Sequence, residues 1–308
     1  MNRAATIGVV LGFAGLVYGQ QPAPATQNPP AAQSGTTQTG NPPPAAAPTQ
    51  PPPGKRQPQA KSTPEYEAFN AARANADPVA LEKAADDFAT KYPESELRLL
   101  LYKAAMHSYQ GANNADKVID MGRKVLKLDP DDPEALVGVA EVLTERTRDS
   151  DIDKDQRLGE AMKLAQRAIE TVETDVAFPP GTPQDKMDAY KGFFRSSAYT
   201  VIGTLQFNKE KYADAEASFH KSIDALPAQP DPVVVLRLAL ALDKQEKYPD
   251  ALTYAGQAAG LTPENTQAGM VARRECDRLV QLTRLAKPAA CGASTTAPTE
   301  NPPAPPKN

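Results

Sequence analysis

The chain has 308 residues and a formal net charge of −4, and 23% of its residues are charged. This composition, with a mean hydropathy of −0.50, excludes an integral membrane bundle and leaves room for one or two globular domains. With only two histidines and two cysteines, the chain cannot build a metal cluster of His and Cys ligands, and histidine-based catalysis is not expected.

Residues 1–19 have the pattern of a secretory signal peptide. Arg3 gives a positive start, and an apolar run of 14 residues extends from Ala4 to Val17. This run is shorter than the roughly 20 residues that a membrane-spanning helix needs, and it suits the apolar core of a signal peptide. We therefore expect cleavage near Gly19 and a periplasmic or secreted protein. An uncleaved membrane anchor is the alternative.

Residues 20–62 consist mainly of Pro, Ala, Gln and Thr, with three basic residues and no acid. Such a segment buries too little apolar surface to fold, so we expect a disordered linker. We expect a similar tail over residues 288–308, whose charges cancel. Because residues 1–62 carry four positive charges, the middle of the chain carries −8. An acidic domain argues against nucleic acid as a partner, because phosphates require a basic face.

Residues 63–287 show helical periodicity almost throughout, and the pattern repeats. In four segments, apolar and small residues recur at steps of three and four. The clearest copy consists of Tyr212, Ala215, Phe219, Ser222 and Pro227. A matching helix precedes each series, 13 residues earlier in three copies and 22 residues earlier in the fourth. This arrangement predicts tandem pairs of helices.

Helix pairs with this spacing, small residues at the crossing and a closing proline resemble the tetratricopeptide repeat (TPR) family. The resemblance covers residues 99–132, 133–175, 196–229 and 232–265, although the family's frequent Trp is absent. It implies an all-α fold, a TPR-type α-solenoid of about eleven helices over residues 63–287. The family binds other proteins without a cofactor, so the resemblance implies a non-enzymatic protein.

The segments that flank the repeats agree with this interpretation. The run Phe-x-x-x-Tyr-Pro-x-Ser at residues 88–95 looks like TPR pairs of bacterial envelope proteins. A charged helix over about residues 264–287 is expected to cap the open end of the solenoid. We therefore favour an exported bacterial TPR protein that serves as a scaffold or adaptor in the cell envelope. The alternatives are a self-associating structural repeat protein and an ion-responsive binding protein.

In TPR solenoids the first helix of each pair lines a concave surface. The resemblance therefore places a partner-binding groove beside the packing positions of those helices. The expected groove residues are Lys103, His107, Glu141, Thr200, Thr204, Leu236 and Leu240. Their trend from charged to apolar indicates an extended or helical peptide with an apolar C-terminal anchor. The alternative is that Val233–Leu242, which is apolar nearly all round, is buried between neighbouring helices.

A nine-residue insertion in the second repeat carries a run of alternating acids. Its carboxylates are spaced like the oxygen ligands of an EF-hand calcium loop. The candidate ligands are Asp149, Asp151, Asp153, Asp155 and Glu160. Lys154 stands where that loop needs glycine, and Gln156 stands where it needs an apolar residue. A solvated acidic loop is therefore preferred to a calcium site.

Cys276 and Cys291 are the only cysteines of a chain that we expect to be exported. Oxidising compartments favour disulfides. The helix rise between Cys276 and residue 287 is about 16 Å, and four extended tail residues with a bridge can cover it. We therefore expect a disulfide that folds the tail back onto the last helix. Two free or intermolecularly paired thiols are the alternative.

Overall fold

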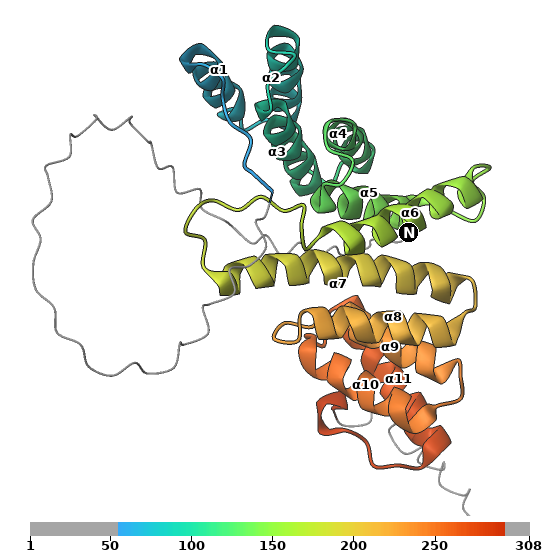
Figure 1. Ribbon diagram of the computed structural model, residues 1–308. Coiled ribbons are helices and arrows are strands. Elements are labelled where there is room, and N and C mark those ends of the chain that lie inside the picture. The colour runs from blue at the N-terminus through green and yellow to red at the C-terminus, as the bar shows by residue number, and fades with distance from the viewer. Residues whose placement is uncertain (1–54, 293–308) are drawn as a thin grey trace, which may run out of the picture. The chain divides into compact units, whose positions relative to one another are not determined.

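The computed structural model describes residues 55–292. Within this range the chain forms eleven α-helices and a short 3-10 turn, and no strand (Figure 1). The elements are α1 (Thr63–Arg73), α2 (Pro78–Lys91), α3 (Leu97–Gly111), α4 (Ala115–Leu128), α5 (Pro133–Arg146), α6 (Lys154–Thr171), α7 (Gln184–Asn208), α8 (Tyr212–Ala225), α9 (Pro232–Asp243), α10 (Tyr248–Leu261), α11 (Gln267–Thr283) and η1 (Ala289–Cys291). The predicted signal peptide and most of the predicted linker and tail lie outside the described residues.

Three of the helices begin with the same two residues, aspartate followed by proline. The carboxylates of Asp77, Asp132 and Asp231 each accept a hydrogen bond from a backbone N–H in the first turn, of α2, α5 and α9 respectively. Such a cap satisfies one of the N–H groups that a helix start leaves without a partner. The proline that follows lacks an N–H and has a backbone angle suited to the first helical position.

Each helix packs against the next helix along the chain. The pairs α3–α4, α5–α6, α7–α8 and α9–α10 coincide with the four predicted repeats, and α1–α2 precede them. The predicted all-α fold of tandem TPR-type helix pairs is therefore confirmed. Among the described residues, no helix has both the length and the apolar character needed to cross a bilayer.

Small residues lie where the helices approach closely, as the repeat pattern predicts. The alanines of three of the series, in α6, α8 and α10, are fully buried or nearly so. At Gly122 of α4, an added Cβ would collide with a methyl carbon of Val139, and at Gly203 of α7 it would lie 2.7 Å from the ring of Phe219. These separations are too short for any larger residue, so the glycines set the distance between neighbouring helices.

Three of the four turns within the pairs share one backbone conformation. Asn113, Glu210 and Glu246 have φ angles of 54°, 60° and 61°. In each turn the next residue donates its N–H to the carbonyl five residues earlier. A non-glycine residue in this left-handed region costs about 1–2 kcal/mol. The same costly conformation in three turns shows that the pairs are structural copies, and the fourth turn, residues 147–153, carries the insertion instead and has no such residue.

The buried apolar side chains form three clusters that follow one another along the chain. The first cluster involves α1 to α5, the second α4 to α7, and the third α8 to α11 with η1. We call them the N-terminal, middle and C-terminal clusters. Because each pair packs mainly on its neighbours, stability is distributed along the repeats, as in other solenoids.

The packed domain begins earlier than the boundary predicted at residue 63. Residues 55–62, which the sequence assigns to the linker, lie against the helical domain. Ala60 packs on the N-terminal cluster, and the Ser62 hydroxyl caps α1 by accepting a hydrogen bond from the Glu65 N–H.

Candidate partner-binding surface

A cluster of charged side chains joins α3, α5 and α7, which are the first helices of three successive pairs. The Nζ atom of Lys103 lies 2.9 Å from Asp132 Oδ2 and 2.6 Å from Glu134 Oε2. The hydroxyl of Tyr190 donates to Glu134 Oε2 at 3.0 Å. The other oxygen of Glu134 contacts His107 Nε2. One carboxylate therefore links three helices.

The charges in this cluster stabilise one another against burial. Desolvation opposes the charge on Lys103, but the carboxylates of Glu134 and Asp132 outweigh it and raise the lysine pKa above its usual range. Desolvation likewise opposes the charge on Glu134, but Lys103 and His107 outweigh it and hold the Glu134 pKa well below its usual range. Of the two predicted groove residues here, only the His107 side chain, 54% exposed, is open to a partner.

Glu141 lies half-buried on α5, beyond this cluster. Burial raises the pKa of Glu141 to about 7, a hydrogen bond with Ser197 of α7 opposes the rise, and the negative charges of Glu145 and Asp231 add to it. At neutral pH this carboxyl group is therefore divided between its charged and neutral forms.

One threonine and one arginine connect α7 to α9. The Thr204 hydroxyl accepts a hydrogen bond from the Arg237 guanidinium at 3.0 Å and donates to the Thr200 carbonyl at 2.7 Å. Burial lowers the pKa of Arg237, and the negative charges of Asp231 and Glu145 oppose this by raising it. Arg237 was not among the predicted groove residues, although it is the only charged residue of the otherwise apolar run Val233–Leu242, and a lone charge in such a run is a signal that could have identified it.

The two apolar groove residues are placed differently from the polar ones. Leu236 is 6% exposed and belongs to the C-terminal cluster, and Leu240 packs partly against the same cluster. The alternative of burial between neighbouring helices therefore holds for Leu236. The predicted apolar anchor site is reduced to the partly exposed side of Leu240.

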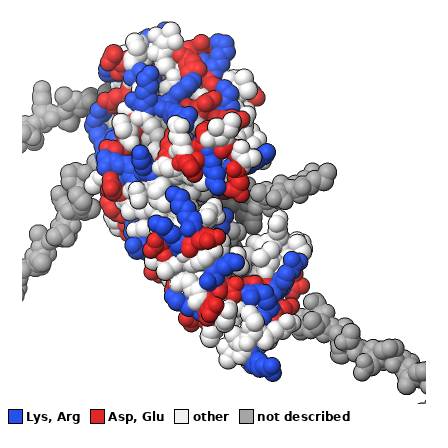
Figure 2. Space-filling model, turned by 90° about the vertical axis from the view of Figure 1, so that its right-hand side faces the viewer, with Lys and Arg blue, Asp and Glu red and all other residues white. Residues whose placement is uncertain are grey.

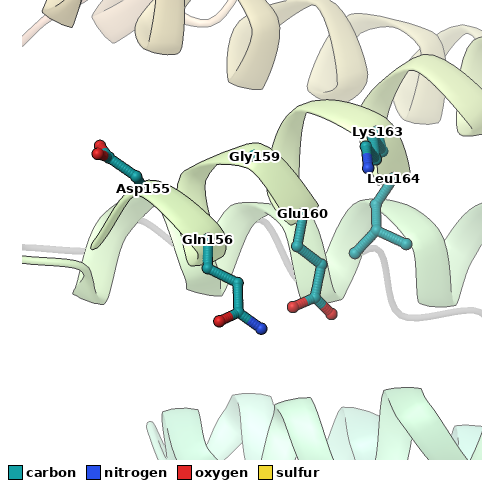
Figure 3. A pocket seen from close by; sticks show the side chains of 6 residues that line it. All are labelled: Asp155, Gln156, Gly159, Glu160, Lys163 and Leu164. Atoms are coloured by element: carbon teal, nitrogen blue, oxygen red, sulfur yellow. The ribbon is translucent and has the colours of Figure 1, made fainter. Parts of the chain in front are cut away.

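The structure does not bring the five candidate calcium ligands together. The helix α6 begins at Lys154, so the last residues of the supposed loop are helical. Asp149 pairs with Lys154 at 2.8 Å, and Glu160 pairs with Arg123 at 3.1 Å. Asp155 and Glu160 point to different sides of α6 (Figure 3).

No group of three or more acidic, His or Cys side chains within residues 55–292 is arranged to hold a metal ion. The candidate ligands Asp151 and Asp153 stay in the turn before α6, where the Asp151 carboxylate accepts the backbone N–H of Arg148. Beside the same helix lies an open hollow of about 550 Å³, lined by residues of α6 alone (Figure 3).

Cys276 of α11 is bonded to Cys291 in η1. The bond holds the chain after α11 against α10, where Pro288 approaches Gly256 so closely that an added Cβ would lie 2.8 Å from it. The first residues of the predicted tail, 288–292, thus belong to the packed domain. The rest of the tail lies outside the described residues.

On the face shown in Figure 2, acidic and basic side chains are interspersed.

No family model matches the chain, and no curated protein is significantly similar to it.

Similar solved structures include that of the MamA protein, with a TM-score of 0.45 and 16% identity over 73% of this chain and 96% of MamA. Another is a thermophilic TPR protein of Thermus thermophilus, with a TM-score of 0.42 and 12% identity over 70% of this chain and 99% of that one. The TPR-type fold of this chain rests on its own helix pairs, their spacing and their buried small residues.

Proposed function

We propose that this protein is a non-enzymatic scaffold or adaptor that binds a segment of another protein along the first helices of its repeats. The observation that carries the proposal is a series of polar side chains that runs from α3 through α5 and α7 to α9. Its members are partly buried and joined from helix to helix. The inner contacts fix the spacing of the pairs, and His107, Glu141 and Arg237 keep hydrogen-bonding capacity for a ligand.

The chemistry of this surface favours an extended polar segment over a purely apolar one. Along the first helices α3, α5 and α9, a partner would meet an imidazole, a half-ionised carboxyl group and a guanidinium in turn. Preformed and spaced by rigid helices, these groups need little reorganisation on binding, which limits the entropy cost. Apolar contact is expected only near Leu240.

Affinity purification with two matched variants tests this proposal. His107→Glu plus Leu240→Glu, the inner variant, adds two negative charges to the surface formed by the first helices. Val79→Glu plus Met270→Glu, the outer variant, adds the same charge at exposed positions of α2 and α11. Thermal melting first establishes that both variants fold. We expect a specific partner to be lost with the inner variant and kept with the outer one. Loss with both variants, or with neither, would contradict the groove assignment.

We also propose that the protein is exported and acts in the bacterial cell envelope. The signal-like residues 1–19 support export, and a disulfide between the only two cysteines suits an oxidising compartment. Mass spectrometry of the protein purified from its native cells tests this. We expect a mature chain that begins at Gln20 and gains about 2 Da on reduction, the mass of the two hydrogens that its thiols take up. A chain that begins at Met1 with two free thiols would refute export.

A further inference from the structure

The segment that precedes α1 lies along the turns that connect one helix pair to the next. These turns are residues 92–96 between α2 and α3, 129–132 between α4 and α5, and 172–183 between α6 and α7. Figure 1 shows the blue segment running from α1 towards the turn between α6 and α7. Three successive turns between pairs thus contribute to one strip of surface.

Each of the three turns supplies one carboxylate to this segment. The Nζ atom of Lys55 lies 2.6 Å from Asp129 Oδ2 and 3.5 Å from Asp175 Oδ1. The guanidinium of Arg56 lies 2.5 Å from Glu96 Oε1, and the N–H of Gln59 donates to Glu96 Oε2 at 3.1 Å. We call Glu96, Asp129 and Asp175 the acidic edge.

Contacts continue along the segment up to the start of α1. Ala60 packs on the N-terminal cluster, and the N–H of Lys61 donates to the Glu65 carboxylate at 2.7 Å. At the other end Lys55 covers Asp129, whose side chain is only 12% exposed. The segment is therefore held at several points and not by a single ion pair.

We infer that the acidic edge is a binding surface for a basic, extended segment, and that residues 55–61 of the same chain occupy it as an intramolecular strap. Charge complementarity supports this assignment, because residues 20–62 contain three basic residues and no acid, whereas the helical domain is acidic. The ion pairs also lower the Glu96 pKa, through Arg56 and the Gln59 N–H, and raise the Lys55 pKa despite burial, through Asp129 and Asp175.

The strap has two consequences for the protein. It fixes the position of Lys55 and Arg56 against the turns of the repeats. It also means that any basic segment of a partner must displace residues 55–61 to reach the acidic edge. Because partly exposed ion pairs are screened by salt, the strap should release at high ionic strength while the apolar helix packing persists.

Limited trypsin digestion of the full chain tests the strap, because trypsin cleaves after Lys55 and Arg56 only when this segment leaves the surface. Glu96→Gln plus Asp129→Asn removes two carboxylates of the acidic edge. The control, Asp131→Asn, lies in the same turn as Asp129 but pairs with Arg167. We expect cleavage of the double variant to be at least about fivefold faster at low salt, which corresponds to a lost contact of about 1 kcal/mol. The control should match the original protein.

Salt provides a second measurement on the unaltered sequence. In 1 M NaCl, cleavage at Lys55 and Arg56 should approach the rate of the double variant, while circular dichroism shows the helices intact. Equal cleavage rates for all proteins at both salt concentrations would overturn the strap. Protection that grows with protein concentration would overturn the intramolecular assignment, because it would place the segment on a second copy of the chain.

Discussion

The helices are joined by different chemistry in two regions of the domain. Between α3, α5 and α7, the link is the charged cluster of Lys103, Glu134 and Tyr190. In α9 to α11, the links are mainly fully buried aliphatic side chains, with one ion pair between Arg278 of α11 and Asp243 of α9 and a disulfide that closes the end of the domain. The helix pairs have similar geometry in both places.

This difference shows that the geometry of the pairs does not depend on one kind of contact. Small residues at the crossings set the approach of the helices, and the remaining contacts can be ionic or apolar. The kind of contact instead decides how the stability of each region responds to pH, salt and substitution. We expect the N-terminal pairs to respond to pH and salt, and the C-terminal pairs to respond to loss of apolar volume.

The largest effect is expected from Leu238→Ala in α9, because Leu238 is fully buried in the C-terminal cluster. A cavity of this kind costs about 3–4 kcal/mol of unfolding free energy. The loss, measured by urea denaturation, should be the same at low and high salt and at pH 5 and pH 8. The exposed Leu282→Ala serves as control and should change stability by less than about 0.5 kcal/mol. A strong salt dependence of the Leu238→Ala loss would break the comparison.

A smaller, pH-dependent effect is expected from Glu134→Gln. It removes the charge that holds Lys103, but Asp132 still pairs with that lysine, so we expect a loss of about 2 kcal/mol at pH 7. Because the folded-state pKa of Glu134 is lowered, its contribution is fully present above the unfolded-state pKa of 4.5 and declines as the pH falls from there through the folded-state pKa. The loss should therefore shrink by about 1 kcal/mol at pH 4.

Urea denaturation at pH 7 and pH 4 measures this change. Glu94→Gln, in an exposed turn, is the control and should have little effect at either pH. A constant loss for Glu134→Gln at both pH values would show that its role is packing and not charge.

The smallest effect is expected from Glu141→Gln, which should raise the free energy of unfolding at high pH, whereas the two preceding substitutions lower it. The folded-state pKa of Glu141 is raised to about 7, above the unfolded value of 4.5. The original protein therefore loses stability as the pH rises from about 4.5 through 7, because the folded state must give up a proton that it binds more tightly. At pH 8 the variant should be more stable by about 1–2 kcal/mol, after allowance for partial exposure.

At pH 4 the two proteins should be equally stable, because Glu141 is then protonated in both the folded and unfolded states. Glu67→Gln, at an exposed position of α1, is the control and should leave stability nearly unchanged at both pH values. If Glu141→Gln were less stable than the original protein at pH 8, the charged carboxylate would stabilise the fold, and this prediction would be wrong.

Several features of the fold could be predicted because they are encoded locally. The aspartate–proline pairs mark the starts of α2, α5 and α9, and the alanine series mark the packed faces. Other local features were not readable. Glu210 and Glu246 lie in left-handed turns where glycine is the usual residue, and Lys154 begins a helix within a run that resembles a calcium loop.

The sequence by itself determined the helix pairs, because a spacing of three and four residues defines one face of a helix whatever surrounds it. It also determined that two cysteines were within reach of each other. Only the tertiary structure decided which polar groups meet, such as Lys103 with Glu134 and Lys55 with Asp129. A charge can pair with any opposite charge that the fold brings near, so its partner depends on the packing of distant helices and turns.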